Sequence, residues 1–119
     1  MHKPAITGTG VFTPGQVVTN EELVEAYNAH AELFNTRNAD AIAAGEMTAR
    51  EPSSTEFIYS ASGIEQRYVM DKGGVLDPEV MHPKLPARDD DEPGIMAEMA
   101  LDACGKALAQ AGRRAEEVG

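Results

Sequence analysis

The C-terminal third of the chain carries one long helical pattern that the rest of the sequence must cover. Residues 93–112 are predicted to form a helix that begins near Pro93 and ends at Gly112. One face of this helix consists of small and apolar side chains: Met96, Met99, Ala100, Ala103, Ala107, Leu108 and Ala111. Such a face is stable only against a large apolar partner, so the fold must supply one.

The opening residues predict a strand with close neighbours. Residues 4–12 have the pattern of a strand, and Gly8 and Gly10 leave no side chain, which is typical of a strand pressed against neighbouring backbone. A Gly-x-Gly after a strand also occurs in dinucleotide sites. That fingerprint needs a third glycine where this chain has Thr13, and then a helix, whereas Pro14 starts a turn here. Close packing is therefore favoured over nucleotide binding.

A capping box marks the start of the first predicted helix. Thr19 and Glu22 lie three residues apart, so each side chain can bond the backbone N–H of the other residue. The predicted buried face of the helix comprises Leu23, Ala26, Tyr27 and either Leu33 or Phe34. A second, short helix is expected over residues 38–44, ended by Gly45.

The middle of the chain predicts a further helix and a strand. Ser53 and Glu56 have the spacing of a second capping box, and the helix that it opens is closed by Gly63. Residues 64–70 then have the character of a strand. Residues 71–92 are punctuated by glycine and proline and end in four consecutive acids, which predicts a long surface loop.

The charge balance excludes a nucleic-acid partner. The chain has 20 acidic and 10 basic residues and a formal net charge of −10, whereas nucleic-acid affinity comes largely from lysine and arginine contacts that release counterions. No stretch approaches the roughly 18 consecutive apolar residues that span a membrane. The start also lacks the apolar core of a secretory signal. The sequence therefore predicts a cytoplasmic protein with no nucleic-acid or membrane partner.

Candidate chemistry within the chain is sparse. His2, His30 and His82 have no metal-like spacing, so no metal site is expected. The acids at 89–92 are expected to cap the following helix and to be solvated rather than to bind a cation. The single cysteine, Cys104, fits a reducing compartment. It lies mid-helix without a nearby histidine in the sequence, which favours apolar packing over nucleophilic chemistry. The Asp-Ser-Leu of phosphopantetheine carrier domains is absent.

Three motifs in order carry a family resemblance. Residues 6–14 (IxGxGxFxP) are followed by 18–23 (VTNEEL), residues 56–67 contain Glu-Phe-Ile, then Ser-Gly-Ile and an arginine, and the alanine-rich helix 95–112 ends in Gln-Ala-Gly. Together they resemble the first strand and helix, the Glu-Trp-Ile…Thr-Gly-Ile…Arg stretch and the following helix of ketoacyl synthase III-type condensing enzymes.

The resemblance implies a fold and a reaction. The fold would be α/β, with residues 1–119 forming the N-terminal portion of a thiolase-like layered αβαβα fold, incomplete in this chain, in a homodimeric enzyme. The reaction would be the decarboxylative condensation of an acyl-CoA primer with malonyl-[acyl carrier protein] in fatty-acid biosynthesis. The coenzyme A thioester is then a substrate, and no tightly bound cofactor is expected. The family's catalytic Cys, His and Asn belong to the remainder of the enzyme, C-terminal to Gly119, so no catalytic residue is expected in this chain.

The resemblance also implies two residues that contact coenzyme A. Phe57 stands where the family has a tryptophan that stacks on the adenine, and Ser53 takes the place of a hydroxyl residue near it. An arginine that meets the phosphates in many members is Ala61 here. Residues 31–52 and 71–92 are additional relative to the family and are expected to lie on the surface and shape the entrance beside Phe57. A core position for Phe57 and a helix cap for Ser53 are the alternatives.

Two hypotheses stay open at this point. The chain is part of a condensing enzyme, or it is a non-catalytic acidic interaction module that retains only the N-terminal scaffold. Residues 1–119 alone are expected neither to condense acyl groups nor to fold as a stable monomer. Two strands and one long helix bury too little surface to offset about 1–2 kcal/mol of backbone entropy per residue.

Overall fold

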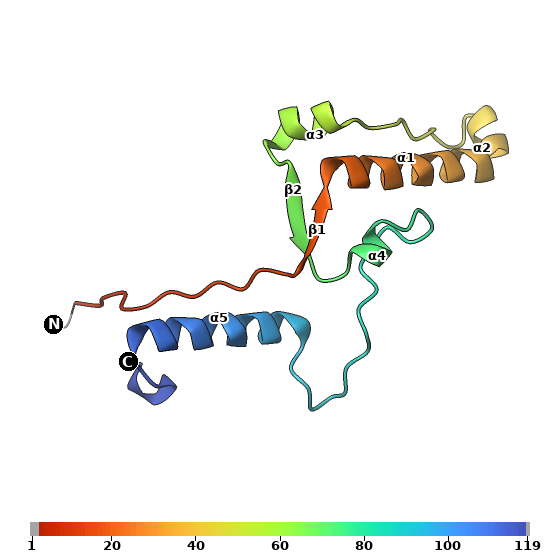
Figure 1. Cartoon of the computed structure of the whole chain (residues 1–119). Helices are drawn as coiled ribbons and strands as arrows, with labels where there is room; N and C mark the ends of the chain where they lie inside the picture. Colours follow the sequence, from red (N-terminus) through yellow and green to blue (C-terminus); the bar gives the residue numbers. More distant parts are fainter. Residues whose placement is uncertain (1–2, 119) are drawn as a thin grey trace. The chain divides into compact units, whose positions relative to one another are not determined.

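The computed structural model describes residues 3–118, which form helices and a small two-stranded sheet (Figure 1). The elements in chain order are β1 (Gln16–Thr19), α1 (Asn20–Arg37), α2 (Ala39–Ala43), α3 (Thr55–Ser62), β2 (Gln66–Val69), α4 (Lys72–Val75), α5 (Ile95–Ala111) and the short 3₁₀ helix η1 (Ala115–Glu117). They divide into two compact units. One comprises residues 14–85, and the other joins residues 3–13 with residues 86–118.

The sheet lies in the unit of residues 14–85. Strands β1 and β2 are antiparallel, with Gln16 opposite Val69 at one end and Thr19 opposite Gln66 at the other. Val18 is fully buried and forms the centre of this unit's small core. The strand predicted after the third helix is thus confirmed, although it is shorter than expected.

The strand predicted over residues 4–12 is wrong. Within residues 3–118 the first strand begins only at Gln16. The segment before it is extended and runs along α5 in its own unit (Figure 1), where the backbone N–H of Thr9 donates to Oε1 of Gln110 at 2.7 Å. A strand requires a neighbouring backbone as its hydrogen-bonding partner, whereas the neighbour that this segment has among the described residues is a helix.

The close packing predicted at Gly8 and Gly10 is confirmed, with α5 as the neighbour. A Cβ atom at Gly8 would overlap the carbonyl oxygen of Ala107, and one at Gly10 would overlap that of Ala103. Lacking side chains, the two glycines let the extended segment approach the helix backbone. Their role is therefore helix packing and not the phosphate loop of a dinucleotide site.

Helix α1 begins as the sequence predicts. The backbone N–H of Glu22 donates to the Thr19 hydroxyl at 3.2 Å, and that of Thr19 donates to a Glu22 carboxylate oxygen at 3.0 Å. The buried apolar residues of this helix are Ala26 and Ala31. Ala26 belongs to the predicted buried face, whereas Ala31 does not. The larger side chains of the predicted face are only partly buried: Leu23, Tyr27, Leu33 and Phe34.

Helices α2 and α3 correspond to the two short helices expected. Helix α2 ends just before Gly45, and α3 ends at Gly63, whose φ of 69° is a left-handed conformation that glycine adopts without strain. The second capping box is wrong by one residue. The side chain that accepts from the backbone N–H of Phe57 belongs to Ser54, at 3.2 Å, and not to Ser53.

The segment 71–92 is only partly a loop. It contains α4, where both carboxylate oxygens of Asp71 accept from the backbone, one from Gly73 and the other from Gly74, each at 3.1 Å. Beyond α4 the chain makes turns, and residues 82–92 are exposed, as a surface loop should be. The sequence does not predict α4, because two glycines within four residues disfavour a helix. The Asp71 carboxylate, which caps the first turn, favours the helix locally.

Helix α5 spans most of its predicted range, but it begins at Ile95 with Gly94 as its N-cap, so Pro93 lies before the helix and not in its first turn. Gly112 follows its last residue, as predicted. Part of the predicted face is half-buried: Met99, Ala103, Ala107, Leu108 and Ala111. Met96 is instead 81% exposed and Ala100 is also exposed. The packing role predicted for Cys104 is wrong, because this residue is exposed. Within its unit the extended N-terminal segment covers one side of the helix only.

Candidate functional site

An apolar groove of about 760 Å³ lies within the unit of residues 14–85. Its walls come from α1, from the segment before α3, from α3 itself and from one residue that follows α4. The lining residues are Leu23, Val24, Tyr27, Glu51, Pro52, Ser53, Ser54, Phe57, Ile58 and Met81. The incompletely buried side chains of α1 are thus explained in part, because Leu23 and Tyr27 face this groove.

The two residues predicted to bind a ligand meet in this groove. Phe57, on α3, is 65% exposed and so presents its ring at the groove rather than packing in a core. Ser53 lies just before α3 and lines the same groove without acting as the helix cap. Among the described residues Phe57 is therefore not part of the core, and the cap of α3 is Ser54 and not Ser53.

An asparagine on α1 fixes the position of Ser53. Oδ1 of Asn28 accepts from the backbone N–H of Ser53 at 2.8 Å, and Nδ2 of Asn28 donates to the Ser53 carbonyl oxygen at 3.1 Å. The side-chain amide thus pairs with a backbone residue in the way a neighbouring strand would. This reciprocal pair holds the groove edge against α1.

The same arrangement recurs two helical turns later. Oδ1 of Asn35 accepts from the backbone N–H of Arg50 at 2.8 Å, and its Nδ2 donates to the Arg50 carbonyl oxygen at 2.9 Å. Residues 28 and 35 lie seven apart, so they share one face of the helix. Together they lay residues 50–53 along α1. The available sequence signal was two asparagines inside a helix, a position where asparagine is unfavourable without a specific partner.

Arg50 connects this edge to the segment after α4. Its guanidinium lies 4.0 Å from the centre of the Phe34 ring and also contacts Nε2 of His30. Nδ1 of His30 lies 2.7 Å from the carbonyl oxygen of Pro78, to which it donates. A neutral imidazole protonated at Nδ1 satisfies both contacts, because Nε2 then accepts from Arg50.

The segment that carries Met81 is held by two carboxylates. Asp71 accepts from the backbone N–H of Lys84 at 2.7 Å. This bond, followed by those from Gly74 and Gly73, holds the pKa of Asp71 below its ordinary value. Asp77 bonds the Lys84 ammonium at 3.0 Å, which lowers the pKa of Asp77 in the same way. Residues from both segments described as insertions, 31–52 and 71–92, therefore reach the groove beside Phe57.

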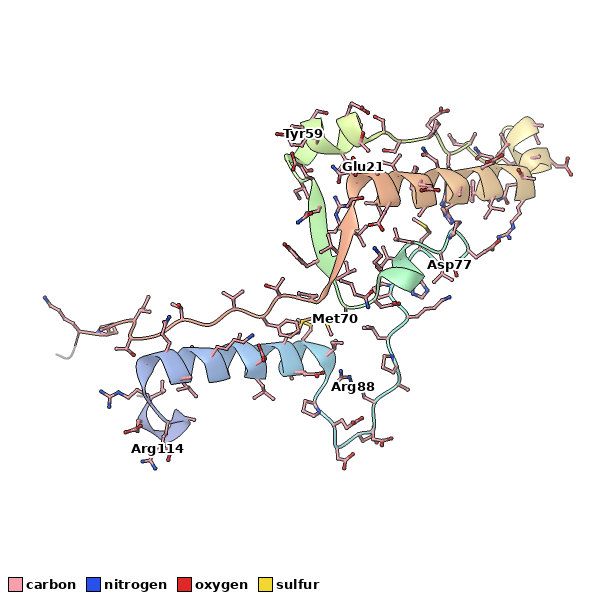
Figure 2. The ribbon with its side chains drawn as sticks, viewed as in Figure 1. Glu21, Tyr59, Met70, Asp77, Arg88 and Arg114 are labelled. Atoms are coloured by element: carbon pink, nitrogen blue, oxygen red, sulfur yellow. The ribbon has the colours of Figure 1, made fainter. Side chains whose placement is uncertain are left out.

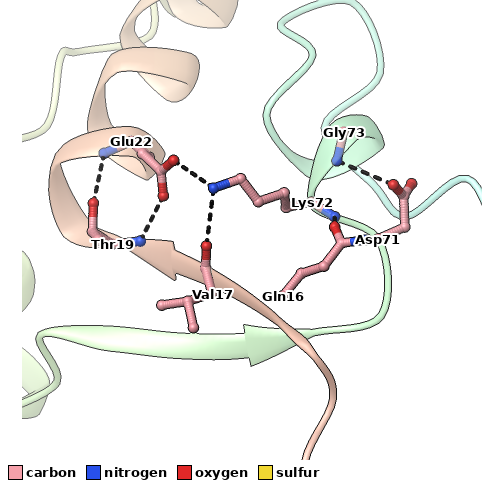
Figure 3. A network of polar contacts seen from close by, with 7 residues as sticks. All are labelled: Gln16, Val17, Thr19, Glu22, Asp71, Lys72 and Gly73. Atoms are coloured by element: carbon pink, nitrogen blue, oxygen red, sulfur yellow. Dashed lines mark hydrogen bonds and ion pairs between the residues drawn. The ribbon is translucent and has the colours of Figure 1, made fainter.

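A polar network around Lys72, the first residue of α4, ties this segment to the sheet (Figure 3). The Lys72 ammonium lies 2.6 Å from a carboxylate oxygen of Glu22 and donates to the carbonyl oxygen of Val17 at 3.2 Å. The backbone N–H of Lys72 donates to Oε1 of Gln16 at 2.8 Å. The side-chain bond from Lys72 is the largest cause of a lowered pKa at Glu22, followed by the bond from the Thr19 backbone.

The described residues lack the side-chain arrangement of a metal site. Within residues 3–118 no three His, Cys, Asp or Glu side chains converge as metal ligands would; His2 lies outside this range. His30 and His82 each bond a backbone carbonyl oxygen. None of the helices in residues 3–118 has the length and apolar character that crossing a membrane requires.

No family model matches the chain. A β-ketodecanoyl-[acyl-carrier-protein] synthase from Pseudomonas aeruginosa is 46% identical to it over 95 residues, which cover 80% of this chain and 27% of that protein. This chain is a homologue of a ketoacyl synthase III-type condensing enzyme. The family resemblance inferred from the three motifs is therefore confirmed. The homologue spans about a quarter of the length of the curated relative that it matches.

One departure from the family pattern lies on α3 of this condensing-enzyme homologue. Ala61, at the position where the resemblance implies an arginine in many members, is exposed and one turn beyond Phe57. The position is open to solvent but carries no charge. Among the lining residues within 3–118 there is likewise no lysine or arginine, and Glu51 carries the one carboxylate. The groove is thus suited to an uncharged part of a ligand.

Proposed function

We propose that this chain forms the coenzyme A entrance of a 3-oxoacyl-[acyl carrier protein] synthase. The observation that carries the proposal is the groove in which Phe57 and Ser53 meet, in a chain homologous to a condensing enzyme. The enzyme would condense an acyl-CoA primer with malonyl-[acyl carrier protein]. Residues 1–119 would then be the N-terminal portion of a thiolase-like layered αβαβα fold, with insertions at about 31–52 and 71–92.

The adenine of coenzyme A is the ligand part that suits the groove. The exposed ring of Phe57 offers a face on which a base can stack, and the serine hydroxyls can bond the polar edge of the base. The phosphates would lie outside the groove, because its described lining contains Glu51 and no cation. Phe57 therefore orients the nucleotide end of the thioester, and other residues neutralise its charge.

The chemistry itself would use residues outside the matched segment. In the family the acyl group moves from coenzyme A to a cysteine, and malonyl carrier protein then loses carbon dioxide and attacks the resulting thioester. Forming the acyl-cysteine divides one difficult step into two easier ones. Cys104 is exposed in the middle of α5, an environment that supplies neither a base nor a helix N-terminus to stabilise a thiolate. The nucleophile would be another cysteine of the complete enzyme.

The relative's product defines a primer to test first. A ketodecanoyl group has ten carbons, and a malonyl unit that loses carbon dioxide contributes two of them. The primer of such a reaction has eight carbons, so octanoyl-CoA is the substrate that we propose. The complete enzyme would be a homodimer, as the family resemblance implies, and cytoplasmic, as the sequence predicts.

The test is condensation by the purified protein that contains this chain. Octanoyl-CoA and malonyl-[acyl carrier protein] should give ketodecanoyl-[acyl carrier protein], detected by intact-mass spectrometry. Phe57→Ala should raise KM for octanoyl-CoA by about 5- to 150-fold, because stacking on a base contributes about 1–3 kcal/mol. Tyr59→Ala is the matched control: Tyr59 is an exposed aromatic residue on α3 (Figure 2) that lies outside the groove lining. Protein that binds coenzyme A without condensing would favour the non-catalytic module instead.

A further inference from the structure

Met81 has a backbone conformation that is unusual for its residue type. Its φ is 57°, and among residues 3–118 it is the one non-glycine residue with a positive φ. In this left-handed region the Cβ atom crowds the following carbonyl oxygen, so a residue other than glycine adopts it only when its surroundings impose it. A glycine would serve the turn better, which leaves the methionine side chain without a backbone reason for its presence.

Hydrogen bonds on the N-terminal side of Met81 impose this conformation. The backbone N–H groups of Val80 and Met81 both donate to the carbonyl oxygen of Asp77 at 2.9 Å. On the C-terminal side, the Lys84 ammonium bonds the Asp77 carboxylate, and the Lys84 backbone bonds Asp71. The turn is therefore closed on both sides of Met81 by residues whose contacts do not involve its side chain.

The same turn is anchored to α1, which forms one wall of the groove. His30 donates to the carbonyl oxygen of Pro78 at 2.7 Å, and the Arg37 guanidinium bonds both carboxylate oxygens of Glu79, at 2.6 and 2.7 Å. These contacts fix the turn on the helix that also carries Leu23 and Tyr27 of the lining. Among the described residues Met81 is the single contribution of segment 71–92 to that lining.

We propose that Met81 is a specificity-determining residue whose side chain contacts the base of the bound nucleotide thioester. A thioether is polarizable and unbranched, so it adapts to the face or edge of an aromatic ring and interacts favourably with it. The strained turn holds this flexible side chain at the groove that contains Phe57. This inference rests on the proposed function, because it takes the groove to be the coenzyme A site.

The backbone conformation makes an informative substitution available. Met81→Gly removes the side chain and also relieves the crowding at φ 57°, so the melting temperature of the variant should change little. Met81→Leu keeps an apolar, unbranched-Cβ side chain with the same backbone cost and serves as the conservative variant. Met47→Gly is a matched control, because Met47 is an exposed methionine outside the groove lining.

The measurement is isothermal titration of the purified full-length protein with two probes. Free coenzyme A contains the adenine, whereas S-octanoyl-pantetheine contains the acyl chain and lacks the base. Met81→Gly should weaken coenzyme A binding by about three- to tenfold and leave S-octanoyl-pantetheine binding unchanged. Met81→Leu should retain most of the wild-type affinity for coenzyme A, and Met47→Gly should bind both probes as the wild type does.

The two ways of failing are distinct. Wild-type protein that binds coenzyme A with an affinity unaltered by Met81→Gly would overturn the role of Met81 and leave the proposed function in place. Weakened binding of S-octanoyl-pantetheine instead of coenzyme A would also overturn it, because Met81 would then contact the acyl chain. Wild-type protein that binds no coenzyme A would overturn the proposed function and the role of Met81 with it.

Discussion

The ammonium of Lys72 lies 2.6 Å from the carboxylate of Glu22, which also closes the capping box of α1 with Thr19. One carboxylate thus stabilises a helix start and ties α4 to it (Figure 3). Both bonds are to the charged form of Glu22, which is why its pKa lies below the ordinary value. The arrangement therefore depends on pH.

We expect acid to weaken this part of the fold. A carboxyl group whose pKa is lowered by folding contributes stability above its unfolded-state pKa, and this contribution is lost as the pH falls through the folded-state pKa. The melting temperature should therefore decrease when the pH is lowered below about 4.3, the ordinary pKa of a glutamate. Glu22→Gln should have a lower melting temperature than wild type at pH 7, and its melting temperature should change less as the pH is lowered. Glu25→Gln, at an exposed position on the same helix, is the control. Identical pH profiles for wild type and Glu22→Gln would contradict the prediction.

The two asparagine pairs on α1 offer a matched test of groove positioning. Asn28→Ala and Asn35→Ala each remove two hydrogen bonds to the backbone of the neighbouring segment. Each should cost about 1–3 kcal/mol of unfolding free energy, measured by urea titration. Only Asn28→Ala releases Ser53, so it alone should raise KM for octanoyl-CoA several-fold with kcat retained. Equal changes in KM for both variants would show that the effect comes from general loosening of α1.

Gly10 should not tolerate a side chain. A Cβ atom there would overlap the carbonyl oxygen of Ala103 on α5, and forced overpacking costs about 1–3 kcal/mol. Gly10→Ala should therefore lower the urea midpoint of the unit that contains α5. Gly15→Ala is the control, because nothing lies within 4 Å of the added atom. A Gly10→Ala variant as stable as the Gly15→Ala variant would mean that the extended segment does not dock on α5.

Cys104 should be dispensable. It is exposed on α5, and surface substitutions away from special features usually change stability by less than about 0.5 kcal/mol. Cys104→Ala should therefore keep both its melting temperature and its condensation rate, whereas removal of a nucleophilic cysteine abolishes acyl transfer. Acyl-enzyme formation is measured by mass spectrometry. Its loss in a folded Cys104→Ala protein would identify Cys104 as the nucleophile.

Residues 1–119 alone should exchange their amide hydrogens quickly. The buried apolar residues of the described range are Val18, Ala26 and Ala31, whereas Ile6 and Met96 are more than four-fifths exposed. So small a core offsets little of the backbone entropy lost on folding. Hydrogen exchange measured by mass spectrometry at micromolar concentration should show weak protection in α5. Strong protection in a species of monomeric mass would show that the chain is a stable domain by itself.

Features encoded within a few residues could be predicted from the sequence. The Thr19 capping box and the helix end at Gly63 follow from side chains next to the backbone that they affect. Features that depend on distant residues could not. Ser54, and not Ser53, caps α3, while Ser53 is held by Asn28, which lies 25 residues away in the sequence. Residues 4–12 are extended as predicted but form no strand, because their neighbour among the described residues is a helix.

The residues of the candidate site also fall into those that the sequence predicts and those that it does not. Phe57 and Ser53 were identified through a family motif, and the groove contains both. The place of Met81 in the groove lining could not be predicted, because it depends on a turn that is closed by Asp77 and anchored on α1. A methionine in a loop rich in glycine and proline gives no sign of such a conformation.

The asparagine pairs recognise only main-chain atoms, and this makes the groove edge adaptable. Asn28 and Asn35 bond the N–H and carbonyl groups of residues 53 and 50, whatever side chains those residues carry. Glu51 and Pro52, between the two attachment points, can therefore be exchanged while the path of the chain stays fixed. Substitutions at these two positions can therefore change the ligand preference of the groove while the backbone around it keeps its conformation. Glu51→Lys is the first replacement to make, because it would bring a cation to an edge that now carries an acid.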